Sequence, residues 1–219
     1  MKQLVLDIRL DAPPRLGNYF IGDNRPLLAA LDALVRGEPT GHLYLWGQPA
    51  TGKSHLLRAV AAEAADTGYL GAAEVAEPLP AHRILAIDDI EHLDDAAAIA
   101  VFNAFNRAAA QGQTLLLAGD APPRELKLRE DLRTRIGQCL AFEIQPLTDA
   151  ARSAILSTLA TQRGLRLDGD VIGYLMRHGR RDMPSMLHTL DALDRASLEH
   201  KRAITLPLLR DLMRTGLDI

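Results

Sequence analysis

A glycine-rich segment of this sequence fits the phosphate-binding loop pattern G-x-x-x-x-G-K-[ST]. Its residues are Gly47, Gln48, Pro49, Ala50, Thr51, Gly52, Lys53 and Ser54. Glycines let the backbone wrap around an anion, and the amide groups of such a loop point inward at phosphates. Lys53 would reach the β- and γ-phosphates, and the Ser54 hydroxyl would ligate magnesium. The segment therefore predicts a site for ATP or ADP with Mg²⁺.

The residues on either side of this loop have the patterns of a strand and a helix. Residues 42–46 form an apolar run short enough for a buried strand, and residues 55–63 carry apolar side chains at helical spacing. His55 begins this helix next to the loop, and we predict that it is one of the nucleotide-binding residues. Strand, loop and helix form the context that the motif requires, whereas an ordinary glycine-containing turn is the alternative.

Two adjacent acids follow another apolar run. Residues 84–87 form a second candidate for a buried strand, and Asp88 and Asp89 come directly after it. Because the carboxyl ends of parallel strands line the ligand crevice, we expect Asp88 to hold the magnesium ion through water. Asp89 occupies the position where many ATPases carry a water-activating glutamate, and its shorter side chain predicts slow intrinsic turnover. The alternative is a strand followed by a polar turn.

A third apolar run, residues 114–118, also ends in a polar tip. This tip would place Asp120 beside the γ-phosphate as a sensor of its presence. The alternative is that Asp120 is a turn residue ahead of Pro122 and Pro123, which explain a turn by themselves.

A charged helix is expected over residues 128–137, before a last strand candidate at residues 139–144. Arg135 near the end of this helix is in a position suited to facing a neighbouring subunit. A guanidinium there can stabilise the charge that develops on a partner's γ-phosphate, and such an arginine finger contributes about 10³–10⁵ in rate. Arg129 and Arg133 lie on the same helix, and each of the three is alternatively a solvated or ion-paired surface arginine.

Composition restricts the class of protein. The chain has 219 residues, of which 47% are hydrophobic, enough for one α/β domain and a small appendage. A net charge of -3 and a pI near 6.2 argue against a broadly basic nucleic-acid-binding protein. Cys139 is the single cysteine, so an intrachain disulfide is excluded, and no apolar run approaches a membrane span. A soluble, cytoplasmic protein is expected.

The elements suggest three parts: an arm over residues 1–12, an α/β domain over 13–146 and an all-helical domain over 147–219. Strand candidates alternate with helical stretches such as residues 95–111, which predicts a parallel sheet flanked by helices. From residue 147 onward the pattern is helical throughout. A phosphate-loop α/β domain followed by a small helical lid is the plan of an AAA+ module.

Taken together, these motifs resemble the Hda family, which comprises DnaA-related AAA+ regulators of the replication initiator DnaA. The resemblance covers nearly the whole chain, and the combination of motifs favours Hda over DnaA. The motifs are Gly22-Asp23-Asn24, Leu27-Leu28-Ala29-Ala30-Leu31, Tyr44-Leu45-Trp46, Ser54-His55-Leu56-Leu57, Ile87-Asp88, Gly119-Asp120, Pro122-Pro123-Arg124, Leu190-Asp191 and Leu193-Asp194-Arg195-Ala196-Ser197.

The resemblance implies roles for Arg135 and for the arm. Residues 132–137 match the family's box that contains the arginine finger, which makes Arg135 that finger. The arm is similar to the family's clamp-binding peptide, in which a glutamine hydrogen-bonds at a pocket rim and apolar residues fill a groove. Its residues are Gln3, Leu4, Leu6 and Ile8. The implied partners are the DNA polymerase sliding clamp and DnaA, with DNA reached only through them. An alternating edge strand is the other interpretation of the arm.

The sequence departs from the family pattern in the lid and in one short passage. Pro184 stands where AAA+ lids usually carry a sensor arginine, and Arg180 or Arg181 is the candidate substitute. The passage over residues 67–82 is short and is expected to leave little room for an extra strand and helix. Tyr19 and Phe20 are expected either beside the adenine base, as the family implies, or in a hydrophobic staple.

The sequence thus predicts an AAA+ regulator of replication initiation with weak or no intrinsic ATPase activity. Bound to nucleotide and docked on the DNA-loaded clamp, it would stimulate hydrolysis of ATP held by DnaA. The main alternative is a helicase-loader-like AAA+ ATPase that binds single-stranded DNA. A DnaA paralogue that is independent of the clamp is a weaker one. Self-association into a homo-oligomer is left open.

Overall fold

The computed structural model describes residues 13–20, 24–180, 183–200 and 203–214. The described chain folds into two compact units, one spanning Pro13–Pro146 and the other beginning at Leu147. The expected clamp-binding residues lie outside the described residues; they are Gln3, Leu4, Leu6 and Ile8.

The first unit is built on a sheet of five parallel strands in the order β2-β3-β4-β1-β5. The strands are β1 (Leu43–Trp46), β2 (Thr67–Gly71), β3 (Ile84–Asp88), β4 (Thr114–Gly119) and β5 (Leu140–Glu143). β1 lies between β4 and β5, with Leu43 opposite both Leu116 and Leu140. The predicted parallel sheet is confirmed.

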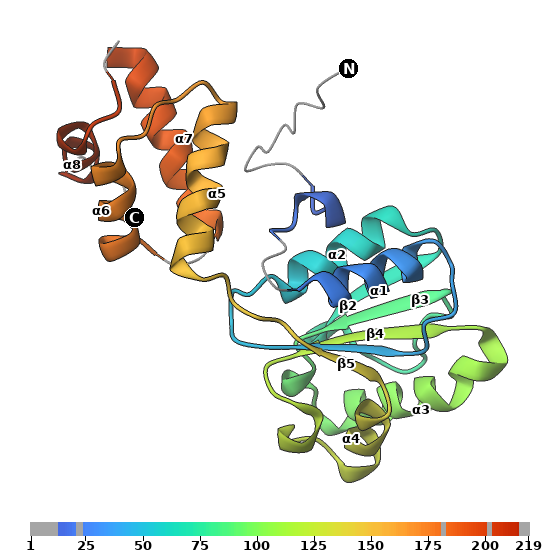
Figure 1. Ribbon diagram of the computed structural model, residues 1–219. Helices are drawn as coiled ribbons and strands as arrows, with labels where there is room; N and C mark the ends of the chain where they lie inside the picture. Colours follow the sequence, from blue (N-terminus) through green and yellow to red (C-terminus); the bar gives the residue numbers. More distant parts are fainter. Residues whose placement is uncertain (1–12, 21–23, 181–182, 201–202, 215–219) are drawn as a thin grey trace. The chain divides into compact units, whose positions relative to one another are not determined.

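Helices cover both faces of this sheet, α1 and α2 on one and α3 and α4 on the other (Figure 1). Side chains alternate along each strand, so Leu43 and Leu45 pack with α1 and α2 while Tyr44 packs with α3 and α4. Both faces of β1, β3 and β4 are buried, which explains their continuous apolar runs. The helices are α1 (Arg25–Val35), α2 (Lys53–Glu63), α3 (Asp95–Gln111) and α4 (Glu130–Gly137).

The structure corrects the expectation for residues 67–82, because β2 forms at the start of that passage and pairs with β3. β2 reads Thr-Gly-Tyr-Leu-Gly, and each of its residues is only partly buried. It therefore lacks the apolar run that marks the other buried strands, and its two glycines weaken the strand signal further. As an edge strand it needs only one neighbour, and β3 supplies that neighbour.

The second unit is all-helical, as predicted, and has its own apolar core. The side chain of Thr148 caps the first helix by accepting a hydrogen bond from the N–H of Ala151 at 3.1 Å. An ion pair between Arg163 and Asp191 ties the end of that helix to the third. The helices are α5 (Asp149–Gln162), α6 (Gly169–His178), α7 (Met183–His200) and α8 (Leu206–Arg214). Within the described ranges, no helix has the length and apolar character needed to cross a membrane.

His42 makes the stability of the first unit depend on pH. Its Nδ1 accepts a hydrogen bond from the N–H of Leu115 on β4 at 3.1 Å, and burial lowers its pKa below the usual value. In the unfolded chain the imidazole of His42 takes up a proton near pH 6.5, whereas in the folded chain it does so only at lower pH. Since the unfolded state then binds more protons, we expect the free energy of unfolding to fall as pH drops below about 6.5.

Urea denaturation at pH 7.5 and at pH 5.5 measures this effect. An asparagine at the same position can still accept from Leu115 but does not titrate, so His42→Asn should have a flatter profile over this interval. Equal pH dependence in the wild-type protein and in His42→Asn would show that His42 is not responsible.

Candidate functional site

The predicted phosphate loop connects β1 to α2, and close contacts require glycine at both of its ends. A Cβ atom on Gly47 would lie 2.9 Å from the carbonyl oxygen of Ile144. Gly52 has φ +96°, and a Cβ there would lie 2.7 Å from Cε2 of Tyr19. Larger residues at either position would displace the loop from its neighbours. The loop therefore has the tight, glycine-dependent geometry that phosphate binding requires.

Lys53 lies within this loop and is bonded only to loop carbonyls among the described residues. Its Nζ donates to the carbonyl oxygens of Gly47 at 2.8 Å and of Gln48 at 3.2 Å. The side chain is 8% exposed, so the ammonium is held inside the concave face of the loop. Ser54 follows in the first turn of α2. A buried cation and a hydroxyl thus follow each other at the start of α2, and these are the two groups that the motif assigns to phosphates and magnesium.

Tyr19 packs against the phosphate loop from outside. Its hydroxyl donates to the carbonyl oxygen of Thr51 at 3.2 Å, and burial raises its pKa to about 12. His55 contacts the segment that carries Tyr19, with Nε2 3.1 Å from the carbonyl oxygen of Arg15. Phe20 is partly buried beside Tyr19 in the chain. Contact of Tyr19 and Phe20 with an adenine base stays a prediction.

The sheet brings the strand-end acids together with the loop. β4 lies between β3 and β1, so Asp88, Asp120 and Gly47 come at the carboxyl ends of three adjacent strands. Asp88 is 1% exposed, whereas Asp89 and Asp120 are exposed. Asp89 has φ +54°, a left-handed backbone that costs energy in a residue other than glycine and is frequent at functional sites. The acids and the loop that the sequence assigns to one site thus lie at the same carboxyl end of the sheet.

Glu91 is a further acid at this edge that the sequence analysis did not select. Its Oε2 is buried and has no hydrogen-bond partner among the residues described. A Cβ atom on Gly119, at the end of β4, would lie 3.3 Å from this oxygen. Burial raises the pKa of Glu91, and the negative charges of Asp120 and Asp89 raise it further. No motif marks this glutamate, because its burial depends on the contact between β4 and the turn after β3.

The oxygen donors at this edge fit a magnesium ion bound together with nucleotide. A hydroxyl and carboxylates are hard ligands of the kind that Mg²⁺ prefers. Across the described part of the chain, no group of three His, Cys, Asp or Glu residues could by itself hold a metal. Magnesium in nucleotide sites is usually held by one or two protein groups, with phosphates and water completing the octahedron. Ser54 and Asp88 are the protein groups that match this role.

Arg135 lies on a different surface from these acids. Its Nη2 donates to Oδ1 of Asn106 on α3 at 2.8 Å, and Cζ lies 5.8 Å from the ring centroid of Phe102. The helix α4 that carries it leads into β5, where the N–H of Leu140 bonds the carbonyl of His42 at the amino end of β1. The phosphate loop leaves the opposite end of β1. Arg135 therefore lies toward the end of the sheet opposite to the phosphate loop.

The other arginines of α4 differ from Arg135 in their contacts. Arg129 forms an ion pair with Asp131 at 3.0 Å on the surface. The side chain of Arg133 has no hydrogen bond or ion pair with any described residue, and the residue is partly buried. In the lid, α7 begins at Met183, so Pro184 falls in its first turn as the sequence predicts.

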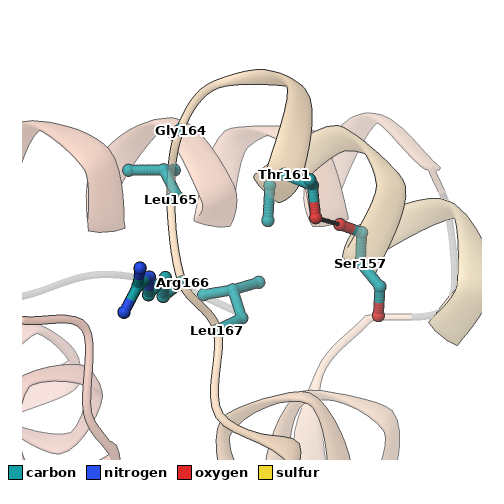
Figure 2. A pocket seen from close by; sticks show the side chains of 7 residues that line it. Ser157, Thr161, Gly164, Leu165, Arg166 and Leu167 are labelled. Carbon is teal, nitrogen blue, oxygen red and sulfur yellow. Dashed lines mark hydrogen bonds between the residues drawn. The ribbon is translucent and has the colours of Figure 1, made fainter.

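The lid also contains a pocket of about 440 Å³ at the end of α5. Figure 2 shows its lining: Ser157 and Thr161 come from α5, and residues 164–167 from the segment that follows. The hydroxyl of Thr161 donates to the carbonyl of Ser157 at 2.8 Å, so it is used within the helix. The pocket shares no lining residue with the phosphate loop. Nucleotide binding at the loop stays a prediction.

Comparisons with known proteins match both units. A model of the Hda lid domain matches residues 149–213. AMPPCP-bound DnaA from Aquifex aeolicus has a TM-score of 0.73 at 22% identity, covering 88% of this chain and 68% of that chain. Domain III of Thermotoga maritima DnaA has a TM-score of 0.73 at 16% identity, covering 97% of this chain and 100% of that one.

A motor protein gives a similar match. The RuvB Holliday junction branch migration motor of Thermotoga maritima has a TM-score of 0.70 at 21% identity, covering 96% of this chain and 76% of that one. At these identities the solved structures establish the AAA+ fold, and the lid model adds a specific similarity of the helical unit to Hda. The chain therefore has an AAA+ fold similar to that of DnaA, and its residues 149–213 match the Hda lid domain.

Proposed function

We propose that this protein is a nucleotide-bound regulator of DNA replication initiation that promotes hydrolysis of ATP held by DnaA. The observation that carries the proposal is the Hda lid domain joined to a DnaA-like AAA+ fold. The buried Lys53 and the glycine-dependent loop support binding of ADP or ATP, with ADP as the ligand of the active form. Magnesium would be held by Ser54 and Asp88, and the phosphates by the loop.

Arg135 is the group that we assign to the partner's nucleotide. It lies toward the end of the sheet opposite to its own phosphate loop, and Asn106 and Phe102 hold its guanidinium at the surface. A guanidinium held in advance stabilises charge that develops on a γ-phosphate without having to reorganise during the reaction. ATP hydrolysis would then occur in the nucleotide site of DnaA, with this chain acting in trans.

Intrinsic hydrolysis by this chain should be weak. Asp89 stands where a longer glutamate would activate water, and its left-handed backbone is restricted by the turn that begins there. Pro184 supplies no charge at the usual position of a lid sensor. Because the protein has few groups that could activate water, the bound nucleotide has a structural role. It stabilises the surface that contacts DnaA.

Clamp docking through the arm gives a direct test of the regulatory proposal. In an extended peptide alternate side chains face the same way, so Leu4 and Leu6 would enter the groove together while Val5 points elsewhere. We expect Leu4→Ala with Leu6→Ala to weaken binding to immobilised sliding clamp about tenfold or more, since two apolar anchors are lost.

Val5→Ala is the matched control in the same arm and should leave clamp affinity unchanged, and none of these changes should alter ADP affinity. Clamp binding that survives the double change contradicts the docking proposal. If the protein instead binds single-stranded DNA directly, with log affinity falling about 0.7 per neutralised phosphate against log salt, the helicase-loader interpretation is favoured.

A further inference from the structure

The phenol of Tyr69 on β2 contacts the buried acid at the end of the neighbouring strand. Its hydroxyl donates to Oδ2 of Asp88 at 2.8 Å, while Oδ1 of Asp88 accepts from the N–H of Asp89 at 3.1 Å. Two bonds to two different oxygens fix the plane of this carboxylate. Each oxygen keeps a further lone pair, so Asp88 can still accept from water molecules on a magnesium ion.

The strand register explains why the residue at this position is able to reach Asp88. β2 pairs with β3 so that Gly71 lies opposite Asp88 and Tyr69 opposite Ala86. Residues two apart on a strand face the same side, so Tyr69 is a diagonal neighbour of Asp88 on one face of the sheet. Only a long side chain spans this diagonal. The ring provides the length, and the hydroxyl provides the donor.

Arg58 connects this pair to the helix that begins at the phosphate loop. Its Cζ lies 5.1 Å from the centroid of the Tyr69 ring, an attractive position for a cation. Arg58 follows Ser54 by four residues on α2, so the two side chains lie on the same face of the helix, one turn apart. The helix face of Ser54 and Arg58 thus meets Tyr69, and Tyr69 meets Asp88. The two expected magnesium ligands, Ser54 and Asp88, are thus connected through Arg58 and Tyr69.

We propose that Tyr69 is a positioning residue for the magnesium ion of the bound nucleotide, acting through Asp88 and supported by Arg58. This inference rests on the proposed nucleotide binding and adds a residue to that site. Tyr69 sets the orientation in which the Asp88 carboxylate meets the water shell of the ion. A tyrosine that served packing alone would depend on its ring, which a phenylalanine retains.

The test is the affinity for ADP, and for a non-hydrolysable ATP analogue, as a function of free Mg²⁺ measured by calorimetry. Groups that orient a metal ligand typically contribute about 10–100-fold to metal affinity. We expect Tyr69→Phe to raise the Mg²⁺ concentration at half effect by about tenfold, the lower end of that range, because Asp88 acts through water. Affinity measured in EDTA should stay unchanged, since that binding does not involve the ion.

A double-mutant cycle shows whether Tyr69 acts through Asp88. In the Asp88→Asn background, Tyr69→Phe should cause no further shift in the Mg²⁺ requirement. Tyr44→Phe is the matched control: it removes the buried hydroxyl of a tyrosine on β1, which donates to the carbonyl of Ala121 at 2.6 Å. It should lower the melting temperature and leave the Mg²⁺ requirement unchanged.

An unchanged Mg²⁺ requirement in Tyr69→Phe, or an equal shift in both backgrounds, overturns the inference. Nucleotide binding by the wild-type protein that ignores Mg²⁺ also overturns it, while leaving the nucleotide proposal standing. If the wild-type protein binds no nucleotide at any Mg²⁺ concentration, the proposed function is contradicted and the inference falls with it.

Discussion

Replacing Arg135 by alanine is expected to abolish the stimulation of ATP hydrolysis in DnaA. Arginine fingers contribute about 10³–10⁵ to the rate of phosphoryl transfer, because they place positive charge where negative charge grows. The change should leave the fold intact. The contacts of Arg135 with Asn106 and Phe102 lie at the surface, and contacts of this kind contribute at most about 1 kcal/mol. Single-turnover hydrolysis of ATP bound to DnaA measures the effect.

Arg133→Ala is the matched control on the same helix. Arg133 lies two positions before Arg135 and has no polar partner among the residues described, so its loss should change the stimulated rate little. Both variants must still bind ADP and clamp, which shows that each is folded. Equal stimulation by Arg135→Ala and the wild-type protein would contradict the assignment of the finger.

Replacing Lys53 by alanine is expected to lower ADP affinity by about 10²-fold or more. Removing one partner of a buried, hydrogen-bonded charge pair costs about 2–5 kcal/mol, and Lys53 is the buried cation within the phosphate loop. The weaker binding should also appear as a smaller stabilisation of the folded protein by ADP. A ligand at 100 times its dissociation constant stabilises the folded state by about 2.7 kcal/mol, and a 10²-fold weaker ligand at that concentration by only about 0.4 kcal/mol.

Lys127→Ala provides the control for charge alone, because Lys127 is exposed and lies outside the phosphate loop. Denaturation with and without ADP should show the full ligand stabilisation for Lys127→Ala and almost none for Lys53→Ala. If Lys53→Ala keeps the wild-type shift, the phosphates do not bind where the loop predicts.

The sequence predicts the elements that bury continuous apolar runs. β1, β3 and β4 have uninterrupted apolar sequences because both faces of each strand are covered. The bounds of α3 agree with the predicted helix, which begins after the capping acid Asp94 and ends before Gly112. β2 is missed because a half-buried edge strand with two glycines carries little of this signal.

The phosphate loop and Asp88 at the end of β3 are predictable for a different reason. Their residue types and spacing follow from the chemistry of phosphate and magnesium, so they form local motifs. The contacts of Tyr69, Glu91 and Asn106 depend on strand register and on the packing of distant elements, which no local pattern records. Asn24 is similar: its amide bonds the backbone of Gln145 in both directions, across most of the first unit.

The measurement that tests the central claim most directly is single-turnover hydrolysis of labelled ATP pre-bound to DnaA. The reaction would contain this protein, ADP and DNA-loaded sliding clamp, and each would be omitted in turn. We expect hydrolysis to accelerate only when all three are present, and the acceleration to be lost with Arg135→Ala. No acceleration, with the protein shown to be folded, bound to nucleotide and bound to the clamp, would contradict it.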